Sequence, residues 1–275
     1  MKTSLKQFIL RHFPALGETL QFHWRRRHVR RLEQRSGVER ITRAFRSQNG
    51  SIVMAGPFKG LLYPNDLNAS ALVAKLVGAY EGELHGAIQT IRARSFTRII
   101  NIGCAEGYYA VGLALLLPKA EVFAFDSDPV EQKRCQQMAL ANGVSDGVHV
   151  GGKCDTALLS QLLVQPGETL IVIDCEGCEY NLLDPTEIPQ LRSCALLVEL
   201  HLEKAWQEEL KQRFATSHDQ SIYTFGQNLI APSEALHVLS RADRALVQRE
   251  WRDPGQECVL LLPKGAAEKD KHLLV

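Results

Sequence analysis

Residues 97–126 read TRIINIGCAEGYYAVGLALLLPKAEVFAFD. Two short apolar runs, at 98–103 and 121–126, lie on either side of a stretch long enough for a helix. Such alternation is typical of a parallel sheet, because the helix returns the chain to the edge at which the next strand starts. This stretch therefore predicts the first strand, helix and second strand of an α/β domain.

The same alternation continues toward the C-terminus. The central runs are almost wholly apolar, as expected for strands covered on both faces, so we predict a Rossmann-like, doubly wound, mostly parallel sheet. The predicted strands are 98–103, 121–126, 148–152, 169–174, 195–201, 221–226 and 257–264. The predicted helices between them are 108–117, 129–142, 155–163 and 204–214.

Three regions differ in composition. Residues 1–50 form a basic N-terminal helical extension with 12 Lys and Arg against three Glu, a formal charge of +9, whereas the whole chain has +1. Residues 51–96 read as a loop and helices that cover the cleft, and residues 97–275 as the sheet domain. The basic extension favours docking on the acidic remainder or on a second subunit, with a membrane surface and nucleic acid as alternatives.

Composition limits the class of protein. The 275 residues are 45% hydrophobic and 23% charged, which is typical of a soluble globular protein. The apolar runs are shorter than the roughly 18 residues of a membrane-spanning helix. Arg11 interrupts the apolar stretch near the start, which argues against a secretory signal. We therefore expect a cytoplasmic protein whose seven cysteines are reduced thiols.

The turn at 103–107, between the first predicted strand and helix, carries the first candidate ligand contacts. Its two glycines, Gly103 and Gly107, permit a tight turn and the close approach of a ligand. A dinucleotide fingerprint needs a third glycine, and Glu106 at the helix start would repel a phosphate. S-adenosylmethionine carries an ammonium and a sulfonium but no phosphate, so it avoids this conflict.

Acidic residues follow the second and third predicted strands. Asp126 lies 23 residues after Gly103, close to the spacing of roughly 20 at which a carboxylate accepts hydrogen bonds from ribose hydroxyls. Asp128 precedes Pro129 and reads as a helix cap. Asp155 reads either as a helix cap or as a partner of the adenine amine.

The ends of the fourth and fifth predicted strands bring carboxylates and an imidazole to one edge of the sheet. Asp174 closes an apolar run and is the candidate general base, with His201 as the alternative. Glu176 and Glu199 would orient the acceptor or a bound cation, since carboxylates and histidine ligate divalent metals. A divalent cation at these four residues stays open as a second cofactor, and no metal ligand is assigned.

Three further features have ordinary structural interpretations. Glu179 falls inside the next helix pattern, and Glu81 and His85 share a helix face, so we expect solvated side chains. Cys175 and Cys178 have the spacing of zinc or redox pairs. The sequence has no second pair with matching spacing, so we expect neither metal nor redox use.

Four stretches resemble the class I S-adenosylmethionine-dependent methyltransferases, and within them the FkbM-type group. They are RIINIGCAEGYYAVGLA, EVFAFDSDP, TLIVIDCEGCEYNLLD and LLVELH, in this order over about residues 97–201. The D-x-E-G-x-E segment with the following E-x-H strand is the more specific part, whereas the turn reads GCAEG where that group more usually has GANxG. The resemblance implies a seven-stranded sheet with the last strand reversed, and O-methylation of a hydroxyl on a sugar, glycan or natural product.

The residues at the strand ends carry the predicted catalytic roles, and the resemblance implies the cofactor contacts. The predicted catalytic residues are Asp174, Glu176, Glu199 and His201. The expected cofactor contacts are Gly103, Glu106, Gly107 and Asp126, to which we add Cys104 in the same turn and Asp155.

The expected partner is a small-molecule or glycan substrate, with a homo-oligomer or peripheral membrane contact through the basic extension left open. Nucleic acid is disfavoured, because acidic residues at the cleft would repel phosphates. Two alternatives remain: an RNA methyltransferase, and a non-catalytic cofactor-binding module that its basic extension recruits to membrane or nucleic acid.

Overall fold

Seven strands form one sheet in the order β3-β2-β1-β4-β5-β7-β6 in this computed structural model, which describes residues 37–67, 71–201, 203–226, 239–247 and 255–265. Strands β1 to β5 run parallel to one another, whereas β7 is antiparallel to both β5 and β6. This confirms the predicted mostly parallel seven-stranded sheet. The strands are β1 (Arg98–Ile102), β2 (Glu121–Phe125), β3 (Val148–Gly151), β4 (Thr169–Ile173), β5 (Ala195–Leu200), β6 (His218–Thr224) and β7 (Glu257–Pro263).

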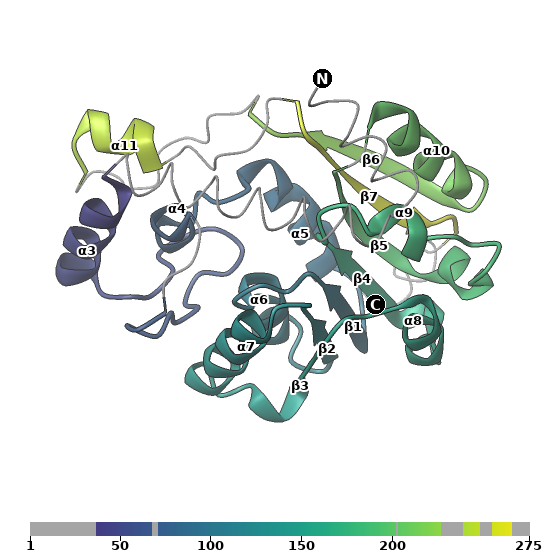
Figure 1. Ribbon diagram of the computed structural model, residues 1–275, viewed down its shortest axis with the longest axis horizontal. Helices are drawn as coiled ribbons and strands as arrows, with labels where there is room; N and C mark the ends of the chain where they lie inside the picture. Colours follow the sequence, from purple (N-terminus) through teal and green to yellow (C-terminus); the bar gives the residue numbers. More distant parts are fainter. Residues whose placement is uncertain (1–36, 68–70, 202, 227–238, 248–254, 266–275) are drawn as a thin grey trace, which may run out of the picture.

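Helices cover both faces of this sheet, while α3, α4 and α11 lie together at one end of the molecule, on the left in Figure 1. No helix in the described ranges is long and apolar enough to cross a bilayer. The helices are α3 (Val38–Asn49), α4 (Leu72–Val77), α5 (His85–Arg92), α6 (Tyr108–Leu116), α7 (Pro129–Ala141), α8 (Thr156–Leu162), α9 (Glu179–Leu182), α10 (Lys204–Phe214) and α11 (Arg241–Val247). The 3₁₀ helices are η1 (Gly82–Leu84), η2 (Ser145–Gly147), η3 (Pro166–Glu168) and η4 (Pro189–Ser193).

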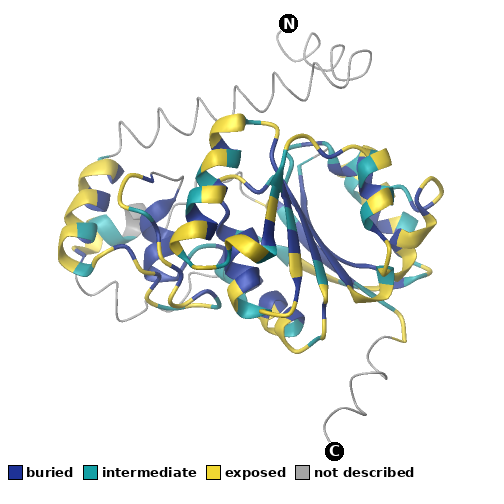
Figure 2. Ribbon diagram, turned by 90° about the horizontal axis from the view of Figure 1, so that it is seen from below, coloured by how far each residue is buried: buried dark blue, intermediate teal, exposed yellow. Residues whose placement is uncertain are grey.

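The central strands are buried on both faces because successive side chains point to opposite sides of the sheet. Ile99 and Leu170 enter the apolar cluster on one face, and Ile100 and Ile171 enter the cluster on the other. Figure 2 shows these strands in dark blue between helices whose outer faces are exposed. This two-sided burial explains the apolar runs in the sequence.

The segment 51–96 shares its core with the sheet. Its apolar side chains Val53, Leu61, Leu76 and Ile88 are buried in the same cluster as Ile99. The short α4 and η1 within it place polar side chains beside the ends of β1 and β4. This segment therefore supplies part of the wall of the site described below.

Two predictions, for the sixth strand and for the N-terminal extension, match the structure only in part. The sixth strand begins at His218 and not at Ser221, because it pairs with β7 as far as Pro263. Of the basic N-terminal extension, only the part from Gly37 is described, and there α3 buries Val38, Ile41 and Phe45. The arginine-rich stretch 25–31 lies outside the described residues.

Candidate functional site

A cavity opens at the carboxyl ends of β1, β4 and β5. Strand order reverses between β1 and β4, which is where ligands bind in open α/β sheets. Five of the predicted site residues line it: Gly103, Cys104, Glu106, Asp174 and Glu199. Five others do not, namely Gly107, Asp126, Asp155, Glu176 and His201.

Backbone contacts within the protein hold the turn after β1 in its conformation. Gly103 N and Cys104 N both donate to Phe125 O, at 2.8 and 2.9 Å. Gly103 has a φ of 80°, and a Cβ built there would lie 1.7 Å from Asp174 O. The close approach of the backbone after β4 therefore requires this glycine, whereas the sequence pattern suggested the approach of a ligand.

Gly107 and Cys104 both contact Cys135 on α7, the helix that packs against the turn. Gly107 has a φ of 100°, and a Cβ there would lie 2.9 Å from Cys135 Sγ on α7, so the glycine permits α6 and α7 to pack closely. A hydrogen bond to Cys135 and burial raise the pKa of the Cys104 thiol well above its usual value. Cys104 therefore lines the cavity as a neutral thiol and not as a nucleophile.

Asp126 and Asp155 both bind backbone amides. Asp126 is buried, and its two carboxylate oxygens accept from Ala105 N at 2.9 Å and Asp128 N at 2.8 Å. Asp155 is exposed and caps α8 by accepting from Leu158 N at 2.9 Å. Asp126 thus holds the turn in place, and ribose binding by Asp126 and adenine binding by Asp155 stay predictions.

Glu106 is paired inside the protein. Its Oε1 lies 2.5 Å from Lys75 Nζ on α4 and accepts from the Tyr63 hydroxyl at 3.1 Å. Lys75 Nζ also lies over the rings of Tyr80 and Tyr108, at 4.7 and 5.3 Å from their centroids. Lys75 therefore neutralises the charge that the sequence placed at the helix start.

Glu81 is buried at the cavity, so the expected solvated helix face is wrong. The chain leaves α4 at Gly78, and Glu81 has a φ of 47° just before η1. Its Oε2 accepts a hydrogen bond from the Tyr109 hydroxyl, and burial together with Glu81 raises the pKa of Tyr109 well above its usual value. The two glycines of GAYEG, Gly78 and Gly82, are the sequence signal that a helix ends there.

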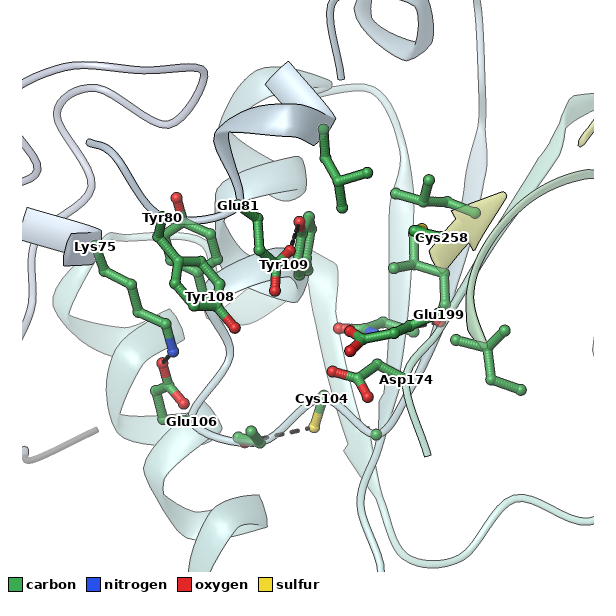
Figure 3. A pocket seen from close by; sticks show the side chains of 17 residues that line it. Lys75, Tyr80, Glu81, Cys104, Glu106, Tyr108, Tyr109, Asp174, Glu199 and Cys258 are labelled. Carbon is green, nitrogen blue, oxygen red and sulfur yellow. Dashed lines mark hydrogen bonds and ion pairs between the residues drawn. The ribbon is translucent and has the colours of Figure 1, made fainter. Parts of the chain in front are cut away.

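Figure 3 shows how these side chains surround the cavity. The Lys75–Glu106 pair lies on one side and the carboxylates of Asp174 and Glu199 on the other, with Tyr109 and Glu81 between them. Three carboxylates therefore face a cavity whose one lysine is already paired. The site favours a ligand that carries positive charge.

Four carboxylates surround the ring of His201, next to the side chains that line the cavity. Its ring is 1% exposed, and its Nδ1 donates to Glu179 Oε1 at 2.8 Å. Its Nε2 lies 3.3 Å from Glu199 Oε1, 3.4 Å from Asp174 Oδ1 and 3.7 Å from Glu176 Oε2. Burial alone would lower the pKa of His201, but Glu179 and Glu199 outweigh burial and raise this pKa well above 6.5. His201 therefore holds a proton at neutral pH.

Glu179 is a second residue that the sequence pattern misplaced. It is 1% exposed, not solvated, and its Oε1 accepts from both His201 and the backbone N–H of Cys175, the latter at 3.2 Å. Its Oε2 is buried without a hydrogen-bond partner. Glu179 starts a helix of only four residues, so the side chain points back at the end of β5.

Cys175 and Cys178 are joined in a disulfide, which corrects the expectation that all seven cysteines are reduced. The turn between β4 and α9 brings their Cα atoms to 5.6 Å, within the range that a disulfide spans. The other five cysteines are free and buried.

Asn101 supplies an unsatisfied acceptor at the cavity. Its Nδ2 donates to Val172 O at 3.3 Å, whereas its Oδ1 is buried with no hydrogen-bond partner. Asn101 lines the cavity from β1. A buried acceptor left unpaired indicates a missing partner, such as a donor from a ligand.

Three side chains of the His201 cluster also have the geometry of cation ligands. Asp174, Glu176 and His201 each offer one ligand atom, and these atoms lie within 4.8 Å of one another. A cation could bind only if His201 gave up its proton.

No protein-family model matches the chain, and no curated protein matches it significantly. Among solved structures, it is similar to the O-methyltransferase TomG from Streptomyces achromogenes in complex with SAM (14% identity, 69% of this chain and 82% of that chain, TM-score 0.43). It is also similar to the C-terminal domain of precorrin-6Y C5,15-methyltransferase from Rhodobacter capsulatus (13%, 74% and 93%, 0.46) and to cofactor-bound Rv0187 from MTB (13%, 73% and 98%, 0.41). At this level of identity and overlap, these similarities carry no conclusion about activity, ligand or substrate.

Proposed function

We propose that this protein is an S-adenosylmethionine-dependent methyltransferase that methylates a hydroxyl group of a sugar, glycan or natural product. The observation that carries the proposal is the set of groups around the cavity. Glu81, Asp174 and Glu199 line it together with the orphaned acceptor Asn101 Oδ1. This set favours a ligand that brings positive charge and hydrogen-bond donors. S-adenosylmethionine carries both, on its sulfonium and its ammonium.

The side chains that line the cavity suit the chemistry of this cofactor. The ring of Tyr109 also lines the cavity and attracts a cation, while Lys75 already lies over the rings of Tyr80 and Tyr108. The groups that would hold the cofactor are Asn101, Glu81 and the turn at 103–106. The phosphates of a dinucleotide would instead meet the carboxylates of Glu81, Asp174 and Glu199, which supports the phosphate-free ligand.

When bound, the cofactor supplies an electrophilic methyl group on a positively charged sulfur. The protein has to align the acceptor and remove its hydroxyl proton. We assign proton removal to Asp174, whose side chain is 39% exposed at the cavity. His201 already holds a proton, so its role is to orient Asp174 and Glu199 by charge and position.

The resemblance of residues 174–179 and 199–201 to FkbM-type enzymes supports a hydroxyl acceptor. An RNA acceptor is less well supported, because the carboxylates at the cavity would repel its phosphates. A non-catalytic module would depend on the arginine-rich stretch 25–31, which lies outside the described residues. A divalent cation at Asp174, Glu176 and His201 stays a separate prediction, which methyl transfer with added Mg²⁺ or with a chelator would test.

Calorimetric titration with S-adenosylhomocysteine and, separately, with NADH tests the cofactor class. We expect binding of S-adenosylhomocysteine alone, and Asn101→Leu should weaken it by about tenfold, since a buried acceptor loses its ligand donor. Radiolabelled methyl transfer into small-molecule, glycan and RNA fractions then tests the acceptor. Binding of NADH without S-adenosylhomocysteine would contradict the cofactor, and label confined to RNA would contradict the hydroxyl acceptor on a small molecule or glycan.

A further inference from the structure

We propose that Cys175 and Cys178 are a site of thiol–disulfide exchange whose oxidation fixes the turn that carries the carboxylates around His201. This assignment goes beyond methyl transfer, since it gives the turn between β4 and α9 a chemistry of its own. The two sulfurs are joined in the structure, and the Cα atoms lie 5.6 Å apart.

The cysteines alternate with the acidic residues that contact His201. Asp174 and Glu176 flank Cys175, and Glu179 follows Cys178. These three carboxylates lie 3.4, 3.7 and 2.8 Å from the ring nitrogens of His201. A change in the covalent state of the pair therefore acts on the segment that places three of the four carboxylates.

A hydrogen bond joins the pair directly to the buried partner of His201. The backbone N–H of Cys175 donates to Glu179 Oε1 at 3.2 Å, and the same oxygen accepts from His201 Nδ1 at 2.8 Å. A displacement of the Cys175 backbone therefore removes one of the two donors that position Glu179. Asp174 is adjacent in the chain and points into the cavity (Figure 3).

The backbone between Cys175 and Cys178 adopts an unfavourable conformation that the rest of the structure has to hold in place. Glu176 has a φ of 59° and Gly177 a φ of 124°. A left-handed conformation is unfavourable for glutamate and persists where the surroundings enforce it. The bridge between Cys175 and Cys178 closes a loop around both residues, so reduction frees the turn to relax.

Cys175 and Cys178 are also more accessible to solvent than the other five cysteines. Cys175 and Cys178 are half-buried, whereas the five free cysteines are all buried. A bridge between residues only three apart in sequence restricts the unfolded chain less than a long-range bridge would. The position of the pair therefore favours exchange chemistry over a purely structural role.

The exchange step is a two-electron reaction with a dithiol or a small-molecule disulfide. In reduction, a thiolate of the dithiol attacks one protein sulfur and breaks the S–S bond, and its second thiol resolves the mixed disulfide. The protein gains two electrons and two protons as two thiols, and the dithiol becomes a disulfide. In oxidation, oxidised glutathione accepts the two electrons and leaves as two glutathione thiols.

Alkylation of the full-length protein tests the chemistry. After treatment with oxidised glutathione, we expect Cys175 and Cys178 to resist iodoacetamide without denaturant, and after dithiothreitol we expect both to react. Mass spectrometry of the peptides locates the modified residues. If the two remain fully alkylated after oxidation, or if dithiothreitol leaves them protected, the assignment is wrong.

Hydrogen exchange tests the coupling to the turn. Reduction should accelerate amide exchange over residues 174–180 by about fivefold or more, as expected when a hydrogen bond is lost. The double variant Cys175→Ser, Cys178→Ser should exchange at the fast rate under both conditions. The control Cys154→Ala, which changes a buried free cysteine, should keep the response to reduction. Equal exchange of the oxidised and reduced proteins would overturn the coupling.

Methyl transfer gives a separate readout that rests on the proposed function. We expect the reduced protein to turn over several-fold more slowly than the oxidised protein, with recovery after reoxidation. Equal turnover of the two forms would overturn the control of the site by the pair. Absence of methyl transfer in both forms would count against the proposed function, and hydrogen exchange alone would then decide the redox inference.

Discussion

Proton removal is the step that depends on a single side chain. Asp174→Asn keeps the shape of the residue and removes its basicity, so we expect turnover to fall by about 100-fold or more. Affinity for S-adenosylhomocysteine should stay within a few-fold of the wild type. Radiolabelled methyl transfer and calorimetry measure the two quantities. The matched control is Asp146→Asn, because Asp146 is exposed and does not line the cavity. Unchanged turnover of Asp174→Asn would exclude this residue as the base.

His201 links the stability of the fold to pH. Its pKa in the folded protein is raised by Glu179 and Glu199 against the effect of burial, and its unfolded-state pKa is about 6.5. Protonated His201 therefore stabilises the fold fully below the unfolded-state pKa, and this contribution is lost as pH rises through the raised pKa.

Urea denaturation of the wild type and His201→Gln between about pH 6 and 9 measures this contribution. The difference in the free energy of unfolding should decrease with rising pH. A difference that grows with pH would contradict the assignment of a raised pKa.

At the level of elements, the turn after β1 packs against the end of β4 at one glycine. Gly103→Ala combines a left-handed backbone with a Cβ that would lie 1.7 Å from Asp174 O. We expect a loss of about 3 kcal/mol in the free energy of unfolding, measured in urea. Gly147→Ala, where a Cβ meets no atom within 4 Å, should change it by no more than about 0.5 kcal/mol. A neutral Gly103→Ala would show that the turn can move away from β4.

The docking of α4 on the turn depends on a buried ion pair. Lys75→Met leaves Glu106 buried without its cation, which should cost about 3–5 kcal/mol. Adding Glu106→Gln should restore most of that loss, since no buried charge remains. The exposed pair of Arg40 and Asp243 is the comparison, and Arg40→Met should cost no more than about 1 kcal/mol. Equal costs for both pairs would contradict the burial of the Lys75 pair.

The proposed ligand site involves much of the molecule, because the cavity is lined by the segment 51–96 and by four strands of the sheet. A ligand that binds only the folded state at 100 times its Kd stabilises that state by about 2.7 kcal/mol. S-adenosylhomocysteine at that excess should therefore raise the melting temperature by several degrees, as measured by calorimetry. NADH at the same concentration should leave it unchanged. A shift with NADH alone would favour a dinucleotide site.

Local patterns were sufficient for the framework of the molecule. The apolar runs that became β1, β2, β4 and β5 are each confirmed to within a residue or two, because a strand covered on both faces is largely apolar. Cap signals such as Asp128 before Pro129 placed the start of α7 correctly. The edge strand β6 was less well defined, since its exposed residues carry no such pattern.

The sequence by itself determined the succession of strands and helices along the chain and the residues that stand at the carboxyl ends of the strands. Hydrophobic periodicity and turn residues, on which these predictions rest, are local properties. Only the tertiary structure decided that Glu81 and Glu179 are buried and that Glu106 is neutralised. Their partners Tyr109, His201 and Lys75 lie 28, 22 and 31 positions away in the chain. Charge pairing across such separations depends on how the elements pack, and no local pattern records it.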